Sequence, residues 1–497
     1  MCFPRSANTH PVSERVPSGR RGPSIDIINR CCLHVNLLRA GDRHPRSHGT
    51  RPSRTRPRGV RVPAHTASTA PTNPRRGKEI RRVVLSSYLG STIEFYDFLL
   101  YATAASLVFG PVFFTGLDPL AATIASYGTF AAGYLARPLG GLVLGHFGDR
   151  IGRKRMLVLS MTIMGVASFL IGLVPPASAI GSWGAIILVG LRICQGIAVG
   201  GEWGGAALMS LEHADRKQRG FAASFTNAGA PSGAVLGTLL MSAFATLPRE
   251  QFLAWGWRIP FLLSAALLVL GLFVRSRVAE SPIFQEAMRS SPPRRRAPVL
   301  DVLRRPRTLL LNMLGCSGSF AIQILFATFA ITYASAAGAD EQLVLLSFAI
   351  ASFLQIGTVL AFGKLSDVVG RRPVMLGGLA LFALLLHPLF GWLGSGNGTL
   401  VFLAFLVGLT CHAMTYGPMA AYISEQVGTT SRYTGASLGY QGATLLGAGL
   451  TPVVLASLHA AHRTPTPLVW FMVTVCALSA AAVLATRESK DNDLQAL

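Results

Sequence analysis

Charged residues are scarce in this chain. Only 13% of the 497 residues are Asp, Glu, Lys or Arg, whereas 51% are hydrophobic and the mean hydropathy is +0.45. Soluble domains carry about 25% charged residues. Acidic residues are the scarcer sign, with 22 Asp and Glu against 45 Lys and Arg. This composition argues against a soluble domain and favours a protein that crosses a membrane many times.

Cysteine is also scarce, and the seven that occur show no ligand or disulfide spacing. They stand at positions 2, 31, 32, 194, 316, 411 and 476. The sequence contains neither a G-x-x-x-x-G-K-[ST] nucleotide-binding loop nor a histidine cluster with metal-ligand spacing nor a triad-like set. We therefore expect no metal and no cofactor, and we expect neither an enzyme nor a primary pump.

Long apolar runs are missing from residues 1–82, which contain 18 Lys and Arg but only 4 Asp and Glu. We expect this basic, Pro- and Arg-rich extension to be disordered because it cannot bury a core. One interpretation is a basic arm for anionic lipid or nucleic acid. The other, which we favour, is a non-native extension, because the first apolar run needs nothing before about Lys78. A cleavable signal peptide pattern is also missing.

Apolar runs long enough to cross a bilayer dominate the rest of the chain. A crossing helix needs about 20 mostly apolar residues, and only helices or closed barrels satisfy the backbone in lipid. Twelve runs of this kind occur, at about 83–108, 120–145, 156–176, 183–209, 221–246, 257–275, 308–334, 343–363, 373–393, 399–423, 434–458 and 466–486. The sequence therefore predicts an all-α membrane protein with twelve transmembrane helices.

Basic residues are distributed unevenly among the predicted loops. The loops that follow the second, fourth, sixth, eighth and tenth spans hold 20 Lys and Arg. The alternate loops hold only Arg249 and Arg463. Because cytoplasmic loops carry the excess of basic residues, both termini are predicted to be cytoplasmic.

The longest connection between the predicted helices divides them six and six. It is a cytoplasmic linker at 276–307, between an N-terminal six-helix bundle at 83–275 and a C-terminal one at 308–486. Residues 487–497 form a short cytoplasmic tail. Parallel repeats of this kind occur in transporters that bind substrate near the membrane midplane, between the halves.

A charged motif, G-x-x-x-D-x-x-G-R-[KR], occurs twice, each time between two apolar runs. The first copy begins at Gly145 and the second at Gly363, 218 residues later, with Ser366 in place of a glycine. The glycines of the first copy predict a tight, non-helical turn. A role in topology alone would not require the Asp and three glycines, so we expect a second role in addition to topology, which the family resemblance described next implies is gating. The residues of this gating loop are Gly145, Gly148, Asp149, Arg150, Gly152, Arg153, Lys154, Asp367, Gly370, Arg371 and Arg372.

Further stretches point to a known family. They are Thr92–Phe98, Ala136–Gly141, Arg192–Gly196, Gly200–Gly205, Trp257–Phe261, Glu280–Phe284 and Arg432–Gly435. Together with the motif, they resemble the metabolite:proton symporter branch of the major facilitator superfamily, which includes permeases for shikimate, α-ketoglutarate, citrate, and proline or betaine. The resemblance covers about residues 80–486. It implies a central cavity lined by spans 1 and 4, and a motif loop that acts as a cytoplasmic latch in the outward-open state.

Three polar residues share one face of the first span. Glu94 lies near its middle, and Asp97 and Tyr101 follow at i+3 and i+7. Two carboxylates so close together, away from bulk water, cannot both ionise at low cost, so one is expected to carry a coupling proton. The alternative is that one carboxylate pairs with a fixed arginine and only holds spans together. Nothing distinguishes Glu94 from Asp97 as the carrier.

Arg192 in the fourth span is the candidate counter-charge for these carboxylates. It either binds a substrate carboxylate bidentately or pairs at rest with Glu94 or Asp97. The two roles are compatible if a substrate anion and a proton exchange places with the internal ion pair. Tyr101 and Glu202, which is about 15 Å further along the helix of Arg192, are also candidate substrate ligands.

The second half offers neutral candidates. The predicted substrate-binding residues there are Asn312, Gln323, His412 and Tyr416, and a helix–helix contact explains each of them about as well. Three charged residues, Arg137, Arg258 and Glu425, are expected to be structural or gating partners.

These observations predict a secondary transporter in the cytoplasmic (inner) membrane. We expect it to import a small organic acid, such as a di- or tricarboxylate or a shikimate-like acid, or a zwitterion, together with a proton. A proton-driven exporter or antiporter is the first alternative, because Gly229–Gly233 partly matches a proline motif of such exporters. A transporter-like sensor or a membrane enzyme is the second. We expect a monomer in the lipid bilayer, with no nucleic-acid partner and with the proton as its coupling ion.

Overall fold

The computed structural model describes residues 74–281, 284–286, 289, 298–492 and 494. Every regular element in this part of the chain is helical, and no strand occurs in it. Most of the predicted extension 1–82, and residues 290–297 of the predicted linker, lie outside these residues.

The helices fall into two sets in chain order. The N-terminal group is α1 (Pro74–Leu107), α2 (Phe109–Phe113), α3 (Pro119–Ile151), α4 (Arg153–Leu173), α5 (Ala177–Ile180), α6 (Trp183–His213), α7 (Arg219–Ala245), α8 (Arg249–Gln251) and α9 (Arg258–Ser276). The C-terminal group is α11 (Pro298–Leu303), α12 (Pro306–Ile324), α13 (Ala330–Ala336), α14 (Glu341–Val369), α15 (Arg371–Leu393), α16 (Gly398–Tyr416), α17 (Met419–Glu425), α18 (Arg432–Thr444), α19 (Thr451–His462) and α20 (Thr466–Ala485). Each predicted apolar run falls on one or two of these helices.

Several of the predicted runs are interrupted helices. A π-helical turn, Leu325–Phe329, joins α12 to α13, and another, Leu445–Gly449, joins α18 to α19. The run at 399–423 breaks at Pro418, between α16 and α17, because proline lacks the N–H that would continue the helix. Such interruptions let a membrane helix bend without leaving the hydrophobic region.

Ten helical segments among the described residues are long and apolar enough to cross a membrane. They correspond to ten of the twelve predicted spans. The other two, α1 with 34 residues and α3 with 33, are not among the ten. Both carry charged residues along their length, including Glu94, Asp97 and Arg137.

Large apolar side chains cover much of the outer surface. Leu135, Val269, Leu384 and Val453 are between 68% and 76% exposed. In water such a surface would associate, whereas in a bilayer lipid covers it. The exposed apolar residues therefore agree with the length of the helices in indicating a membrane protein.

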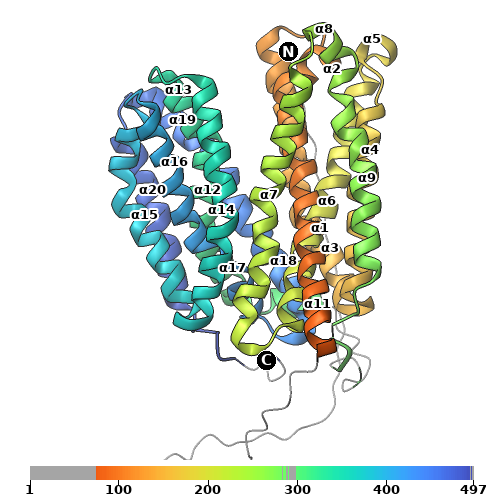
Figure 1. Cartoon of the computed structure of the whole chain (residues 1–497), viewed down its shortest axis with the longest axis vertical. Coiled ribbons are helices and arrows are strands. Elements are labelled where there is room, and N and C mark those ends of the chain that lie inside the picture. The colour runs from red at the N-terminus through yellow and green to blue at the C-terminus, as the bar shows by residue number, and fades with distance from the viewer. Residues whose placement is uncertain (1–73, 282–283, 287–288, 290–297, 493, 495–497) are drawn as a thin grey trace, which may run out of the picture. The chain divides into compact units, whose positions relative to one another are not determined.

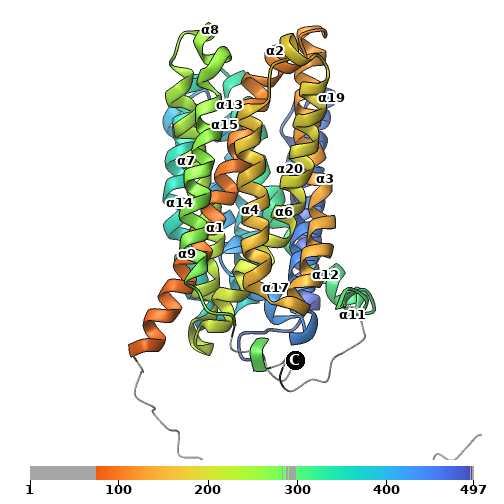
Figure 2. The same cartoon turned by 90° about the vertical axis from the view of Figure 1, so that its right-hand side faces the viewer.

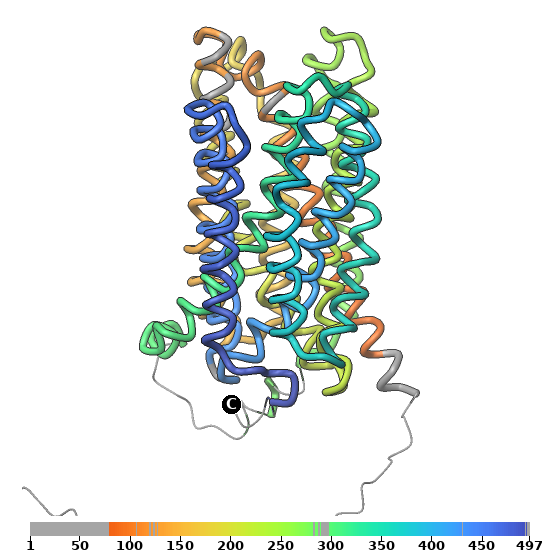
Figure 3. Tube along the Cα trace, turned by 90° about the vertical axis from the view of Figure 1, so that its left-hand side faces the viewer, coloured from red at the N-terminus to blue at the C-terminus, as the bar shows by residue number. Residues whose placement is uncertain are grey.

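The two groups of helices meet near one end of the long helices. Figure 1 shows the N-terminal group in orange to green and the C-terminal group in teal to blue, and Figures 2 and 3 show both sides of the same arrangement. The main pairs of helices in contact between the groups are α3 with α18 and α7 with α14. At this end Asp149 accepts hydrogen bonds from α18, and Asp367 accepts them from α7. We call it the motif end, because both copies of the charged motif lie there.

The buried apolar residues form a core within each group and one between them. An aromatic cluster in the N-terminal group contains Tyr101, Phe109 and Trp257. The shared core joins Trp203 of α6 to residues of the C-terminal group such as Tyr440. Their rings stack with centroids 3.6 Å apart, so the groups are closely packed at this level.

Candidate functional site

The first element of the site is a polar face of α1. Glu94, Asp97 and Tyr101 are each no more than 2% exposed. Ser264 of α9 donates a hydrogen bond to Oδ1 of Asp97 at 2.5 Å, and Tyr101 donates one to Thr129 of α3 at 2.8 Å. Oε2 of Glu94 and Oδ2 of Asp97 have no hydrogen-bond partner among the described residues. Two buried carboxyl groups are thus incompletely satisfied.

Arg192 of α6 lies against this face in a cage of aromatic rings. Its guanidinium carbon is 4.2 Å from the ring centroid of Tyr101, 4.7 Å from that of Phe98 and 4.9 Å from that of Phe130. Its Nη1 donates to Gln195 at 3.1 Å. Nε and Nη2 have no partner in the described part of the chain. The structure therefore brings Arg192 and Tyr101 together, and it leaves two guanidinium nitrogens available to an anion.

A second arginine, Arg137 of α3, reaches the same place. Its guanidinium carbon is 4.3 Å from the ring centroid of Phe98 and 4.5 Å from that of Tyr134. Arg137 is 5% exposed and forms no salt bridge with a described residue. Phe98 is therefore shared by two guanidiniums, each of which gains cation–π attraction from it. The sequence-based expectation of a structural or gating role did not place Arg137 beside Arg192.

Three charged residues from other helices surround Glu94. The positive charges of Arg137 and Arg275 and the negative charge of Glu202 all act on its carboxyl group. Arg275 pairs with Glu202 through both terminal nitrogens, with an Nη1–Oε2 distance of 2.9 Å, and Ser160 donates to the same oxygen at 2.5 Å. Because its carboxylate is held in this buried pair, Glu202 is placed as a partner of Arg275 and not beside Arg192.

In the C-terminal group, His412 and Tyr416 stack on each other, with centroids 4.9 Å apart. Nδ1 of His412 is 2.6 Å from the side-chain nitrogen of Gln355. The hydroxyl of Tyr416 is 3.0 Å from that of Tyr440, the ring that stacks on Trp203. This series of side-chain contacts thus ends at the core between the two groups.

Three other candidates lie apart from the arginine pair. Asn312 is near the start of α12 and lines a cavity of about 40 Å³ with residues 426–428. Gln323 is half-buried near the end of the same helix. Arg258 donates to the carbonyl oxygens of Gly172 and Val174 at 2.8 Å each, and so fixes the end of α4. These contacts indicate helix packing for Arg258.

The first motif copy differs from the predicted non-helical turn. α3 continues to Ile151, so Gly145 and Gly148 are helical, and only Gly152 leaves the helix, with φ = 119°. A side chain at Gly148 would collide with the ring of Tyr433. The glycine is therefore needed for the close approach of α18 and not for a turn, which was the error in the prediction.

Asp149 joins the first motif copy to the opposite group. Its oxygens accept from the backbone N–H of Tyr433 at 3.1 Å, and from the N–H and hydroxyl of Thr434 at 2.9 and 2.8 Å. These residues begin α18, where backbone N–H groups lack helical partners and attract negative charge. Burial raises the pKa of the Asp149 carboxyl to about 6, although Arg153 and the three donors act in the opposite direction.

The second copy makes the corresponding contact in the other direction. Asp367 accepts from the backbone N–H of Gly220 and Phe221 at the start of α7, both at 2.8 Å. It also accepts from Arg371 of its own group at 2.7 Å. Gly370 has φ = 116°, which matches Gly152. Each motif Asp thus binds the first turn of a helix in the other group.

Two of the remaining gating-loop residues, Arg153 and Arg371, belong to a buried charge network. Arg153 pairs with Glu212, and Arg371 pairs with Glu425 at 3.1 Å. Lys154 donates to the backbone oxygen of Ser276 at 2.8 Å, and Arg372 to that of Leu484 at 2.9 Å. Arg150 is exposed. Glu425 thus binds a residue of the second motif copy.

Sequence reasoning missed four members of this network. Glu212 binds Arg432 across the groups at 3.2 Å, while Glu280 and Glu488 accept from the first backbone N–H groups of α4 and α15. A repeat could have revealed Glu280 and Glu488, because Glu-Ser occurs at 280 and again at 488, after the last long helix of each group. Burial raises the pKa of Glu488, but the backbone N–H donors of Arg371, Arg372, Lys490 and Ser489 outweigh it and lower the pKa overall.

Comparison with known proteins agrees with this arrangement. The model of the Major Facilitator Superfamily matches residues 83–366 and 314–496. The chain is 37% identical over 426 residues to the inner membrane metabolite transport protein YhjE of Escherichia coli strain K12, covering 83% of this chain and 95% of that protein. It is also 37% identical over 417 residues to the shikimate transporter of the same strain, covering 82% and 95%.

A solved structure shows the same fold. The proton:xylose symporter XylE bound to 6-bromo-6-deoxy-D-glucose superposes with a TM-score of 0.71 at 18% identity, covering 84% of this chain and 98% of that one. The chain belongs to the major facilitator superfamily. It is therefore a membrane transporter and not an enzyme, and the predicted family is confirmed.

Proposed function

We propose that the protein imports a small organic acid together with a proton across the inner membrane. The observation that carries this proposal is the pair Arg137 and Arg192, which share the ring of Phe98 and form no salt bridge with a described residue. The incompletely bonded carboxyl groups of Glu94 and Asp97 lie on the helix that also carries Phe98. The two arginines thus supply anion recognition, and the neighbouring carboxyl groups supply proton exchange.

The guanidinium pair favours a carboxylate as the recognised group. A guanidinium presents parallel N–H donors that match a carboxylate, and binding is strongest in a site that excludes water. A carboxylate of the substrate would replace ring contacts of Arg192 with hydrogen bonds to its unpartnered Nε and Nη2. The relative named as a transporter of shikimate, an organic acid, supports this class. A zwitterion fits only if Glu94 or Asp97 takes its cationic end.

The carboxyl groups of α1 supply the proton-binding element. A carboxyl group within a membrane protein that lacks a fixed counter-ion is a common proton carrier. We propose that proton binding at Glu94 or Asp97 and substrate binding at the arginines are coupled through their mutual charge. No other cofactor or coupling ion enters this mechanism.

The membrane arrangement is part of the proposal. α1 and α3 join the ten apolar segments to give twelve spans in two six-helix halves, with both termini and the motif end in the cytoplasm. The contacts of Asp149 and Asp367 then keep the cytoplasmic side closed, and alternating access requires them to break. The transporter acts as a monomer in the bilayer and binds no nucleic acid.

The test is uptake into proteoliposomes under an imposed pH gradient. A panel of monocarboxylates, dicarboxylates, tricarboxylates and betaine is offered with and without a protonophore. We expect a carboxylate to accumulate, and the protonophore to abolish its accumulation. Uptake that proceeds only with the opposite gradient would instead show an exporter or antiporter. A chain that moves none of the panel in either direction would overturn the proposed substrate class.

Two variants separate the roles of the carboxyl groups. Replacing the true proton carrier, by Glu94→Gln or Asp97→Asn, abolishes uphill uptake and leaves exchange of internal for external substrate intact. Exchange requires no net proton movement, and so it reports folding and binding together. Unchanged uphill uptake in both variants would remove these residues from the mechanism.

A further inference from the structure

The polar face of α1 continues beyond Glu94 toward the motif end. Ser87 and Gly90 precede Glu94 by seven and four residues, so they lie on the face that also carries Asp97 and Tyr101. Ser87 is 3% exposed and points into the N-terminal group, where it donates to the backbone oxygen of Ala206 at 3.0 Å. A polar track thus leads from the candidate substrate site toward the motif end, inside one group of helices.

Arg275 lies against α1 one helical turn before Glu94, at Gly90. A side chain at Gly90 would collide with Nη2 of Arg275, so the guanidinium lies directly against α1, one helical turn from Glu94. The same guanidinium holds Glu202, whose Oε2 also accepts from Ser160. A buried carboxylate therefore lies next to Glu94 and on the side toward the motif end, and its charge acts on Glu94.

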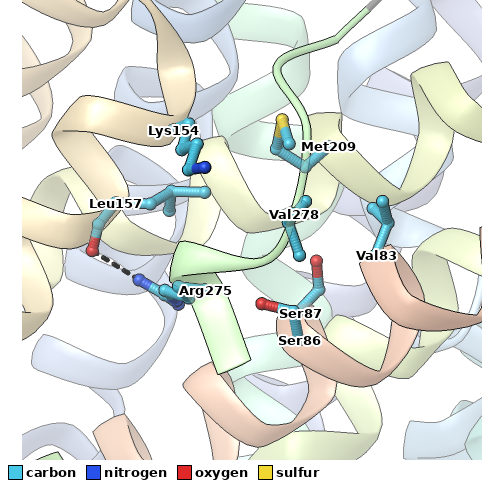
Figure 4. Close-up of a pocket in the computed structure, with 8 residues that line it drawn as sticks. All are labelled: Val83, Ser86, Ser87, Lys154, Leu157, Met209, Arg275 and Val278. Atoms are coloured by element: carbon cyan, nitrogen blue, oxygen red, sulfur yellow. Dashed lines mark hydrogen bonds between the residues drawn. The ribbon is translucent and has the colours of Figure 1, made fainter. Parts of the chain in front are cut away.

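Arg275 also lies beside a small cavity. The cavity is lined by Val83, Ser86, Ser87, Lys154, Leu157, Met209, Arg275 and Val278, and has a volume of about 10 Å³. This is close to the smallest space that holds one water molecule. In Figure 4, Ser86 and Ser87 approach the cavity from α1, and Arg275 points to the backbone oxygen of Leu157, which it binds at 2.5 Å. Hydroxyl, ammonium and guanidinium groups are thus available to a water there.

We propose that the proton leaves Glu94 through Glu202 and the cavity beside Ser86 and Ser87, and not through the pathway between the two groups. This inference rests on the proposed proton coupling. It assigns Glu202 and Arg275 a role in proton transfer, in addition to any role in helix packing. It also separates the exit of the proton from that of the substrate.

The transfer proceeds in two balanced steps. In the first, the O–H bond of protonated Glu94 breaks and one forms at Glu202, so the negative charge moves to Glu94, where Arg137 and Arg275 stabilise it. In the second, a water that enters from the cavity beside Arg275 takes the proton from Glu202, and the resulting hydronium passes a proton to water on the cytoplasmic side. Glu202 returns to its ion pair with Arg275. Carboxylate relays of this kind carry protons in other membrane proteins.

The closed interface between the groups is a further reason for a separate route. Asp149 and Asp367 hold the first turns of α18 and α7 at the motif end. The track from Glu94 to Ser87 lies within the N-terminal group and crosses neither contact. A proton is therefore able to leave by this route while the substrate pathway is closed on that side.

The experiment compares uphill uptake with exchange in two independent variants. Glu202→Gln removes the relay, and Ser86→Leu fills the cavity without changing a charge. We expect each to lower the accumulated substrate by about tenfold or more, since general acid–base groups contribute at least 10²-fold to proton transfer. Exchange should stay near the wild-type rate. Ser276→Leu is the matched control, because it makes the same replacement on an exposed residue next to Arg275.

The outcomes separate this inference from the proposed function. If wild-type accumulation is abolished by a protonophore but both variants accumulate normally, the route is wrong and proton coupling stands. If the wild type ignores the protonophore, both proposals fail. If Glu202→Gln does not reach the membrane because Arg275 has lost its partner, Ser86→Leu decides alone. Loss of exchange equal to the loss of accumulation in Ser86→Leu would show a packing defect and overturn the route.

Discussion

The two groups of helices are alike at the motif end and unlike in their interiors. Both carry a motif Asp that binds the opposite group, a buried Arg–Glu pair and a glutamate that binds the first turn of the next helix. Deeper in the membrane, the N-terminal group holds Glu94, Asp97, Arg137, Arg192 and Glu202, whereas the C-terminal candidates are neutral. Charged groups at this depth are costly. We therefore propose that the duplicated residues serve the conformational change that both halves share, and that the N-terminal half recognises the substrate.

The largest effect expected from this division is at Arg192. Arg192→Lys replaces a planar fork with a point charge, and we expect the half-saturating substrate concentration to rise by about tenfold or more, which is about 1.4 kcal/mol of binding. His412→Gln in the C-terminal group should change it much less. Initial uptake rates against substrate concentration measure both. Equal effects of the two variants would show that recognition is shared between the halves.

A smaller effect should distinguish the two motif aspartates. All three donors to Asp149 come from the opposite group, whereas Asp367 divides its carboxylate between that group and Arg371. Each hydrogen bond to a charged group contributes about 1.5–3 kcal/mol. Asp149→Ala removes the acceptor and leaves these donors unpaired, so it should open the motif end more than Asp367→Ala does. Distances between spin labels at the exposed positions Arg216 and Arg304 report the opening, and a larger response to Asp367→Ala would contradict the ranking.

The smallest effect expected is a pH response of the same contact. Carboxyl groups in water have a pKa near 3.9, and burial raises that of Asp149 to about 6 in the closed state. The closed state therefore binds the proton more tightly, so the cost of burying Asp149 is present above pH 6 and is relieved as the pH falls from about 7 to about 4. The closed population should rise severalfold over this range, measured with the same labels. An identical pH response in Asp149→Asn would assign it to another group.

Most of the fold was predictable because its cause is local. Long apolar runs predict helices wherever they occur, and the repeated motif marked corresponding places in the two halves. The site was less predictable, since its contacts join residues far apart in the chain. Glu94, Asp97, Tyr101 and Arg192 were found by their charge or spacing, but the ring of Phe98 that places Arg137 beside Arg192 has no signature in the sequence. Glu202 is misplaced by the sequence for a similar reason, because nothing in the sequence links it to its partner Arg275, 73 residues further along the chain.

The glutamates that follow the sixth long helix of each group have a consequence for synthesis. Glu280 binds α4 of its own group, and Glu488 binds α15 of its own group. Each half therefore contains the glutamate that binds the helix after its own motif copy, and a ribosome finishes the first of these contacts before it begins the second half. The halves should consequently assemble when they are translated as two separate polypeptides divided after residue 289, with Arg432 and Glu212 forming a bond between the two products.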